Sequence, residues 1–299
     1  MQESRLKNYL HLHFIIFIWG FTAILGALIT IDAIPLVWYR MLLASIFLIV
    51  FIVLTKKNLK IDKHTLAKFV LGGVIIALHW ITFFLAIKSS NVSIALITMS
   101  TGAFFTSLIE PLFFKRRISK LELFLGLVVV VGLYIIFQVK GDYLIGIIYG
   151  LISSFLSALF SVANGLYVKK NEPIIISFYQ LLFGTLFITI LLFFTNQFTV
   201  DFFEVSKSDW VYLIVLGSIC TAYAFSSSVK VMKVLSPYTV MLSINLEPVY
   251  GIILALIIFG ESEKMEPKFY IGAVIILFSV ILNGLVKNRK QLFKRFQKK

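Results

Sequence analysis

The chain has 299 residues, of which 60% are hydrophobic and only 14% are charged, and its formal net charge is +14. A soluble domain is roughly half apolar and about a quarter charged. This composition therefore excludes a soluble enzyme, a secreted scaffold and a disordered tail, and leaves a polytopic membrane protein. The single cysteine, Cys220, lies within an apolar run, which indicates a small buried hydrophobe and excludes an intramolecular disulfide.

Ten apolar runs are long enough to cross a membrane, which takes about 20 residues for a helix. The first run follows Arg5 and Lys7, but it is about twice as long as a signal-peptide core, so we expect a retained helix. The connections are short, with Asn196–Asp209 the longest, and leave no room for a separate soluble domain. In chain order, the predicted spans are Leu10–Thr30, Ile34–Thr55, Leu66–Ile87, Val92–Phe114, Leu121–Val139, Tyr143–Val168, Ile174–Thr195, Trp210–Val229, Pro237–Phe259 and Phe269–Val286.

The basic residues alternate along the chain in step with these spans. If the N-terminus is cytoplasmic, 22 of the 28 Lys and Arg residues fall in inner segments and five in outer segments, while Arg40 lies within a span. Membrane proteins concentrate Lys and Arg in their cytoplasmic loops. The split therefore predicts that both termini are cytoplasmic, and it supports the number of spans because one missed helix would scramble the alternation.

The two halves of the chain resemble each other. Residues 90–137 align with residues 236–283 at a constant offset of 146, which pairs Gly102 with Pro248. Two earlier segments align at offsets of 140 and 145, namely residues 35–40 with residues 175–180, and Leu71-Gly72 with Leu216-Gly217. Few residues are identical, but the collinear order of the matches favours an internal repeat.

Each half holds five spans, an odd number, so the second half must enter the membrane in the opposite sense. Inverted repeats are typical of transporters, whose substrate site lies near the midplane between the repeats. The sequence thus predicts an all-α membrane protein of ten helices in two inverted five-helix repeats, residues 1–139 and 140–286. A basic cytoplasmic tail, residues 287–299, follows them.

Short motifs in these spans resemble those of the drug/metabolite transporter superfamily, and within it the EamA-type transporters. The matching residues are Trp19-Gly20, Arg40, Leu246-Glu247-Pro248-Val249, Gly260-Glu261 and Gly272. The resemblance covers nearly the whole chain, and it implies a cavity lined by the first, third, fourth, sixth, eighth and ninth helices. The first repeat has Gly102 where family members often have proline, so the two halves are not expected to bend alike.

Glu247 is the deepest carboxylate in the predicted spans. Ser243 and Tyr250 would share its helix face, and Pro248 would bend the helix there. Intramembrane acids commonly mark ion and substrate pathways. We expect a proton or substrate-ammonium site at Glu247, with a neutral carboxyl that fixes helix packing as the alternative.

Other polar residues fall inside spans and carry weaker predictions. Arg40 either snorkels outward, pairs with an acid or binds an anionic group, and Glu110 with Pro111 is expected to brace the cytoplasmic interface near Arg116. His79 is a candidate proton shuttle, with a packed or cavity-lining role as the alternative, and Trp80 is expected to line the pathway. Further lining candidates, for each of which helix packing or interfacial anchoring is the alternative, are Trp19, Thr98, Thr101, Ser157, Ser161, Asn164, Tyr223 and Ser227.

The predicted function is a secondary transporter of small organic metabolites, amino acids or drug-like solutes, with export as the expected direction. The solute class and direction come from the resemblance. The chain has no phosphate-binding loop that would point to ATP, and no metal-ligand or nucleophile motif that would point to a membrane-embedded enzyme. A facilitated uniporter or channel-like pore is the main alternative.

The expected partners follow from the same reasoning. We expect a small-molecule substrate, anionic inner-leaflet lipid at the basic tail, no cofactor and no nucleic acid, and we leave a homodimer open. The expected location is the plasma (inner) membrane, crossed several times.

Overall fold

The computed structural model of the protein describes residues 2–115, 117, 120–138 and 143–296, and the regular structure it assigns there is helical. In chain order the helices are α1 (Gln2–Leu28), α2 (Ala33–Leu54), α3 (Lys63–Ser89), α4 (Val92–Met99), α5 (Gly102–Phe113), α6 (Lys120–Phe137), α7 (Leu144–Tyr167), α8 (Pro173–Phe194), α9 (Val200–Phe203), α10 (Lys207–Gly217), the π-helix η1 (Ser218–Tyr223), α11 (Ala224–Val231), α12 (Pro237–Ile244), α13 (Glu247–Phe259), the 3₁₀-helix η2 (Gly260–Glu263) and α14 (Pro267–Phe296).

Within the described residues, eight helical segments are long and apolar enough to cross a membrane. These segments are α1, α2, α3, α4–α5, α7, α8, α10–α11 and α12–α13 with η2. The two remaining predicted spans coincide with α6 and α14, whose apolar parts are shorter, Phe124–Ile136 and Pro267–Ser279. The all-helical membrane fold predicted from hydropathy is therefore confirmed, while the number of ten crossings stays a prediction.

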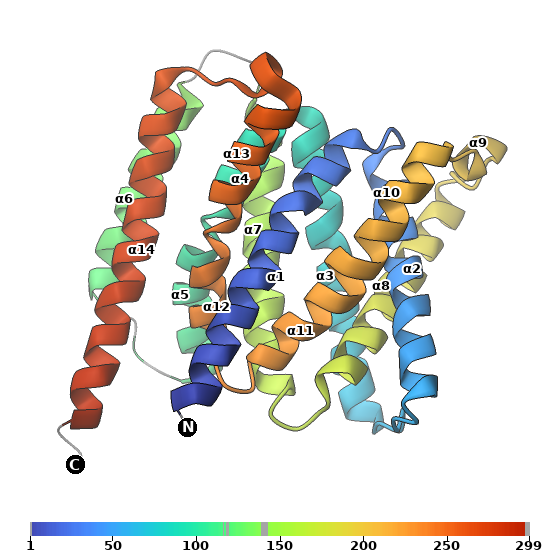
Figure 1. Ribbon diagram of the computed structural model, residues 1–299, viewed down its shortest axis with the longest axis horizontal. Helices are drawn as coiled ribbons and strands as arrows, with labels where there is room; N and C mark the ends of the chain where they lie inside the picture. The colour runs from blue at the N-terminus through green and yellow to red at the C-terminus, as the bar shows by residue number, and fades with distance from the viewer. Residues whose placement is uncertain (1, 116, 118–119, 139–142, 297–299) are drawn as a thin grey trace.

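The segments lie side by side as a bundle with both chain ends at the same end (Figure 1). α1 runs away from that end and α7 runs toward it, so the two halves are traversed in opposite senses (Figure 1). α2 packs on α8, its partner in the repeat, and α6 packs on α14 in the same way. This pairing of equivalent helices is what a two-fold relation between the halves produces.

The crossing of α6 and α14 has matching contacts from both sides. A Cβ built on Gly132 would lie 2.6 Å from Cγ1 of Ile276, and one built on Gly272 would lie 2.6 Å from Cγ1 of Ile136. The backbones approach so closely that the Gly272 position would bring a Cβ to 2.7 Å from the carbonyl oxygen of Gly132. Small residues permit such close helix packing in membranes, and here they join the two halves.

The fourth and ninth predicted spans are both interrupted in the middle. α4 ends at Met99 and α5 begins at Gly102, while α12 ends at Ile244 and α13 begins at Glu247. Both halves are therefore interrupted at equivalent positions, although only the second has a proline there. In the second half Pro248 takes one of the first positions of a new helix, as proline prefers.

In the first half, hydroxyl groups break the helix where no proline is present. The hydroxyl of Ser100 donates to the Ile97 carbonyl at 2.6 Å, and that of Thr101 donates to the Thr98 carbonyl at 2.8 Å. Such local side-chain bonds compete with the regular helical ladder. The same break is thus reached by different chemistry in the two halves.

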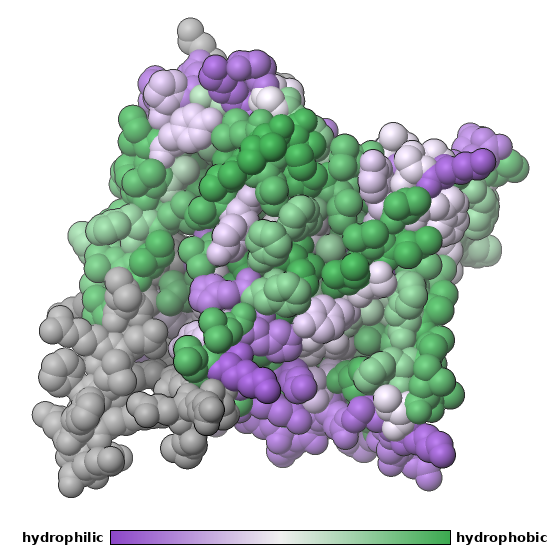
Figure 2. Space-filling model, viewed as in Figure 1, coloured by the Kyte–Doolittle hydropathy of each residue, from purple (hydrophilic) through white to green (hydrophobic). Residues whose placement is uncertain are grey.

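The outer flank of the bundle is mostly hydrophobic, and hydrophilic residues gather at its two ends (Figure 2). Large apolar side chains stand exposed along this flank, including Leu54 at 76%, Phe194 at 76% and Ile257 at 74%. A soluble monomer rarely exposes so continuous an apolar surface. The flank matches the hydrocarbon core of a bilayer, which is about 30 Å thick.

Candidate functional site

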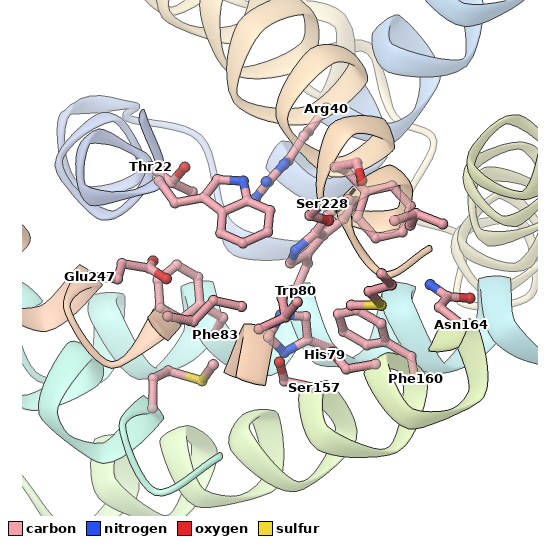
Figure 3. Close-up of a pocket in the computed structure, with 18 residues that line it drawn as sticks. Thr22, Arg40, His79, Trp80, Phe83, Ser157, Phe160, Asn164, Ser228 and Glu247 are labelled. Atoms are coloured by element: carbon pink, nitrogen blue, oxygen red, sulfur yellow. Dashed lines mark hydrogen bonds between the residues drawn. The ribbon is translucent and has the colours of Figure 1, made fainter. Parts of the chain in front are cut away.

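A cavity of about 60 Å³ lies inside the bundle where the two halves meet. The six spans named by the resemblance all contribute to its wall, and α2 adds Arg40. A buried water molecule needs only about 10–15 Å³ of such space, so the cavity has room for a few waters. Its lining residues are Trp19, Thr22, Arg40, His79, Trp80, Phe83, Met99, Ser157, Phe160, Ser161, Asn164, Phe225, Ser228, Val229, Met232, Val240, Ile244 and Glu247 (Figure 3).

Arg40 is held in place by an aromatic ring and one hydroxyl. Its side chain is only 2% exposed, its Nε donates to Oγ1 of Thr221 at 2.7 Å, and its guanidinium carbon lies 3.9 Å from the ring centre of Trp80. Nη1 has no hydrogen-bond partner among the described residues. A buried charged donor without a partner is costly, so this nitrogen is suited to an incoming anionic group.

The π-helix η1 positions the partner of Arg40. Oγ1 of Thr221 donates to the carbonyl of Leu216, five residues earlier, and accepts the bond from Arg40. The wide turn also leaves the carbonyl of Cys220 to accept from Nε1 of Trp19 at 3.0 Å. π-helical turns often occur at functional sites, and here one such turn joins α1 and α2 to the second half.

Glu247 enters the cavity from a different side than Arg40 (Figure 3). It is the first residue of α13, directly after the interruption, and the described residues offer its carboxylate no hydrogen bond. No ion pair within 4.0 Å joins it to Arg40. The wall therefore carries an acidic and a basic side chain that are not in direct contact with each other.

His79 is fixed through one ring nitrogen. Nδ1 lies 2.9 Å from the carbonyl oxygen of Ser153 and 2.8 Å from its hydroxyl, and that hydroxyl also donates to the His79 carbonyl. Since the Ser153 carbonyl can only accept, Nδ1 carries the proton and Nε2 is left as an acceptor, to which the described residues donate no hydrogen bond. The ring also contacts Phe160, at 5.3 Å between centres.

The far wall of the cavity carries a neutral polar pair. Asn164 accepts a bond from Nε2 of Gln180 at 2.7 Å, while its own Nδ2 has no partner in the part of the chain that the structure describes. Gln180 occupies the position in α8 that Arg40 occupies in α2, by the offset of 140. Ser157 and Ser161 lie on the same side of α7 as Asn164 and line the cavity, as their helical spacing predicts.

Several predicted lining residues lie elsewhere. Ser243 donates to the Thr239 carbonyl, and Tyr250 packs on Phe17 and Gly20, because the break before Glu247 ends the helix face that the three residues were expected to share. The hydroxyls of Thr98 and Thr101 bond to carbonyls in their own segment, and Thr101 also bonds to Ser154 of α7.

The remaining predicted residues also lie outside the cavity wall. Tyr223 and Ser227 face a groove between helices. Pro248 follows Glu247 in α13, while Glu110 is buried in α5 beside Pro111. The expected partner of Glu110, Arg116, falls outside the described residues.

Two acidic residues that the sequence analysis did not single out close the bundle at the end away from the chain termini. Glu263 accepts from the backbone nitrogens of Val92 and Ser93 at 2.8 and 2.9 Å, and so caps α4. Asp209 accepts from the backbone nitrogen and hydroxyl of Thr30 at 3.0 and 2.6 Å. Both carboxylates are buried, and each joins one half of the molecule to the other. Glu263 stands two residues after the quoted Gly260-Glu261, which was the available signal.

The opposite end is joined by a more exposed ion pair. Nζ of Lys57, after α2, lies 2.6 Å from a carboxylate oxygen of Glu172, before α8, and their side chains are 33% and 56% exposed. This contact with Lys57 holds the pKa of Glu172 below its usual value. Exposed pairs contribute little to stability, so this end is the more weakly closed of the two.

The fold and cavity together define a multi-pass integral membrane protein of the transporter type, with two repeats around a central cavity. No group of three or more His, Cys, Asp or Glu residues able to hold a metal occurs in the part of the chain that the structure describes. The family model of the EamA-like transporter family matches the chain twice, over residues 8–138 and 144–285. The chain belongs to this family, which confirms the resemblance seen in its motifs.

Individual relatives agree with this assignment. The chain is 22% identical over 254 residues to the uncharacterized transporter YdfC of Bacillus subtilis (strain 168), covering 84% of this chain and 81% of the relative. It is 24% identical over 238 residues to an uncharacterized transporter of Clostridium kluyveri, covering 76% and 75%. A crystal structure with 13% identity superposes with a TM-score of 0.69 over 94% of this chain and 98% of the other, which shows a common fold.

Proposed function

We propose that this protein is a secondary transporter of small zwitterionic solutes with an apolar side chain, such as apolar amino acids. The observation that carries the proposal is that Nη1 of Arg40 and the carboxyl group of Glu247 line the same cavity, and that neither has a hydrogen-bond partner among the described residues. A solute carboxylate would pair with Arg40 and its ammonium group with Glu247. The buried guanidinium and the partly buried carboxyl would then each gain a partner of opposite charge.

The remaining wall supports an apolar solute side chain. Trp19, Trp80, Phe83, Phe160 and Phe225 supply aromatic surface between the charged groups. Binding sites for small molecules commonly combine such apolar walls with a few placed polar groups. Because the cavity holds only a few waters, the solute enters and leaves when the helix bundle opens at one end.

Alternating access would arise from rocking of the two halves about this cavity. The proposed topology has ten crossings, with both termini and the more exposed Lys57–Glu172 closure on the cytoplasmic side of the plasma membrane. The distribution of basic residues supports this orientation. Loading from the cytoplasm and release outside would make the protein an exporter.

Glu247 is also the proposed site of proton coupling. A carboxylate that binds either a proton or a solute ammonium group exchanges one for the other, so that an inward proton gradient drives the solute out. If Glu247 only binds the solute, the protein is a facilitator whose flux ignores the gradient. The two mechanisms differ in a single measurable property.

The test is uptake of radiolabelled leucine into proteoliposomes of the purified protein, with and without an imposed pH gradient. We expect saturable flux that the gradient stimulates, and loss of that stimulation in Glu247→Gln. Ser243→Ala is the matched control, because Ser243 lies just before the interruption but outside the cavity. Gradient-driven flux in Glu247→Gln would refute proton coupling, and no flux of any amino acid in the folded wild type would refute the zwitterion site.

A further inference from the structure

A second and larger hollow opens on the membrane-facing side of the bundle, at the end that holds the chain termini. It has a volume of about 750 Å³ and lies between α2, the start of α8 and η1–α11. We call it the lateral groove. Its lining residues are Phe47, Leu48, Phe51, Lys57, Glu172, Pro173, Ile174, Ser218, Ala222, Tyr223, Ser226, Ser227, Lys230 and Lys233.

The mouth of the lateral groove is basic. Lys57, Lys230 and Lys233 line it together with Glu172, which pairs with Lys57. Lys230 and Lys233 form no ion pair with another described residue. A separate hollow of about 510 Å³, next to the lateral groove, shares Glu172 and Lys233 with it and is also lined by Lys169 and Lys170. The site therefore attracts an anion at the level where the helices leave the membrane.

The depth of the groove is a large part of one leaflet of a bilayer. Its α2 wall extends from the end of the helix at Leu54 back to Phe47, which at 1.5 Å per helical residue is about 10 Å, and Lys57 lies beyond that end. Half of a 30 Å hydrocarbon core is about 15 Å. Phe47 and Phe51 are 39% and 48% exposed. An apolar channel of this length below a basic mouth has the shape of an acyl chain below a headgroup.

The wall opposite α2 adds polar groups at intermediate depth. The side chain of Ser227 faces the groove, and its hydroxyl forms no hydrogen bond with another described residue. The phenol of Tyr223 also lies there and is hydrogen bonded to Nε2 of His11 at 3.0 Å. Hydroxyls at this level suit the ester oxygens of a glycerophospholipid, which lie between its phosphate and its acyl chains.

We propose that the lateral groove is a binding site for an anionic phospholipid. Lys230 and Lys233 hold the phosphate and the additional headgroup charge, Ser227 contacts the ester region, and one acyl chain lies along Phe47 and Phe51. A free phosphate would use the lysines but leave the apolar channel uncovered. Clusters of basic residues at helix ends are known to recruit anionic lipids, and here the apolar wall adds a place for the tail.

The test is native mass spectrometry of the full-length protein in detergent, titrated with phosphatidylglycerol or with phosphatidylcholine of the same acyl chains. We expect tighter binding of phosphatidylglycerol. Lys230→Gln combined with Lys233→Gln should weaken it about tenfold or more, since each basic residue near an anionic headgroup contributes about 1 kcal/mol. Lys60→Gln combined with Lys63→Gln is the matched control, because it removes the same charge at the same end but outside the groove.

A second variant tests the apolar wall, and the thermal stability of every variant checks folding. Phe51→Ser should weaken both lipids, because it shortens the channel without changing the charge. Three results would overturn the proposal. They are an equal loss of phosphatidylglycerol binding in the two double-lysine variants, equal binding of the two lipids to the wild type, and displacement of the lipid by millimolar inorganic phosphate. Binding is measured without transport, so the result is independent of the proposed substrate and coupling.

Discussion

Replacing Arg40 by glutamine tests whether its guanidinium recognises a solute carboxylate. The variant should fold, because Gln180 occupies the equivalent position in α8 and is itself fully buried. Glutamine keeps a donor for Thr221 but removes the charge and the unpaired Nη1. The change therefore affects recognition more than architecture, and a thermal melt of the purified variant checks this.

The expected magnitude follows from the missing contact. A hydrogen bond to a charged group contributes about 1.5–3 kcal/mol, which corresponds to roughly 10- to 150-fold in affinity at 1.4 kcal/mol per factor of ten. The wild type should therefore prefer leucine to leucinamide, which lacks the carboxylate, by about this factor. Arg40→Gln should lose most of the preference by weakening leucine binding alone.

The assay is competition by the two compounds against uptake of radiolabelled leucine in proteoliposomes, with affinities taken from full inhibition curves. Glu247→Gln is the matched variant, because it also removes one cavity charge but should keep the preference for a carboxylate. A variant of Arg40 that still separates leucine from leucinamide as the wild type does would refute the assigned contact. Equal loss in both variants would show that cavity charge in general, and not Arg40, controls recognition.

Three further predictions concern stability in thermal melts. Glu263→Gln should lower the free energy of unfolding by about 1–3 kcal/mol, since it removes the charge that caps α4. Glu261→Gln is the control and should change stability little, because the Glu261 side chain is 86% exposed. Gly272→Ala should cost about 1–3 kcal/mol by overpacking the α6–α14 crossing, unlike Val274→Ala at an exposed site. The contact with Lys57 lowers the pKa of Glu172, so above pH 4.5 the wild type should be more stable to unfolding than Glu172→Gln, by under about 1 kcal/mol. This difference in stability should vanish as the pH falls through the folded-state pKa of Glu172. An advantage of Glu172 that does not shrink as the pH is lowered below 4.5 would contradict the last of these.

The positions of the helices could be predicted from hydropathy. A backbone segment in hydrocarbon must satisfy its own hydrogen bonds and therefore forms a helix, and hydropathy shows which segments lie in hydrocarbon. The polar side of α7 could be predicted for the same reason, since Ser157, Ser161 and Asn164 repeat with the helical period. Ser243 and Tyr250 were placed by the same rule and do not line the cavity, because a helical period has no meaning across the break before Glu247.

The contacts between residues far apart in the chain could not be predicted from the sequence. Glu263 and Val92 are 171 residues apart, and nothing local to either residue indicates that a carboxylate of one half caps a helix of the other. Thr98 and Thr101 show the opposite problem, because polar residues in a membrane span can satisfy their hydroxyls on carbonyls of their own segment. Polarity within a span therefore identifies candidates, and only the packing of the helices separates those that face the cavity.

The short helix α11 has a different hollow on each of its two sides. Ser228 and Phe225 face the central cavity, while the adjacent Ser227 faces the lateral groove. One helix therefore separates the two hollows. If the cavity takes the solute and the groove takes a lipid, as proposed, a displacement of α11 that enlarges one hollow narrows the other, and the lipid in the groove would then affect the room available to the solute.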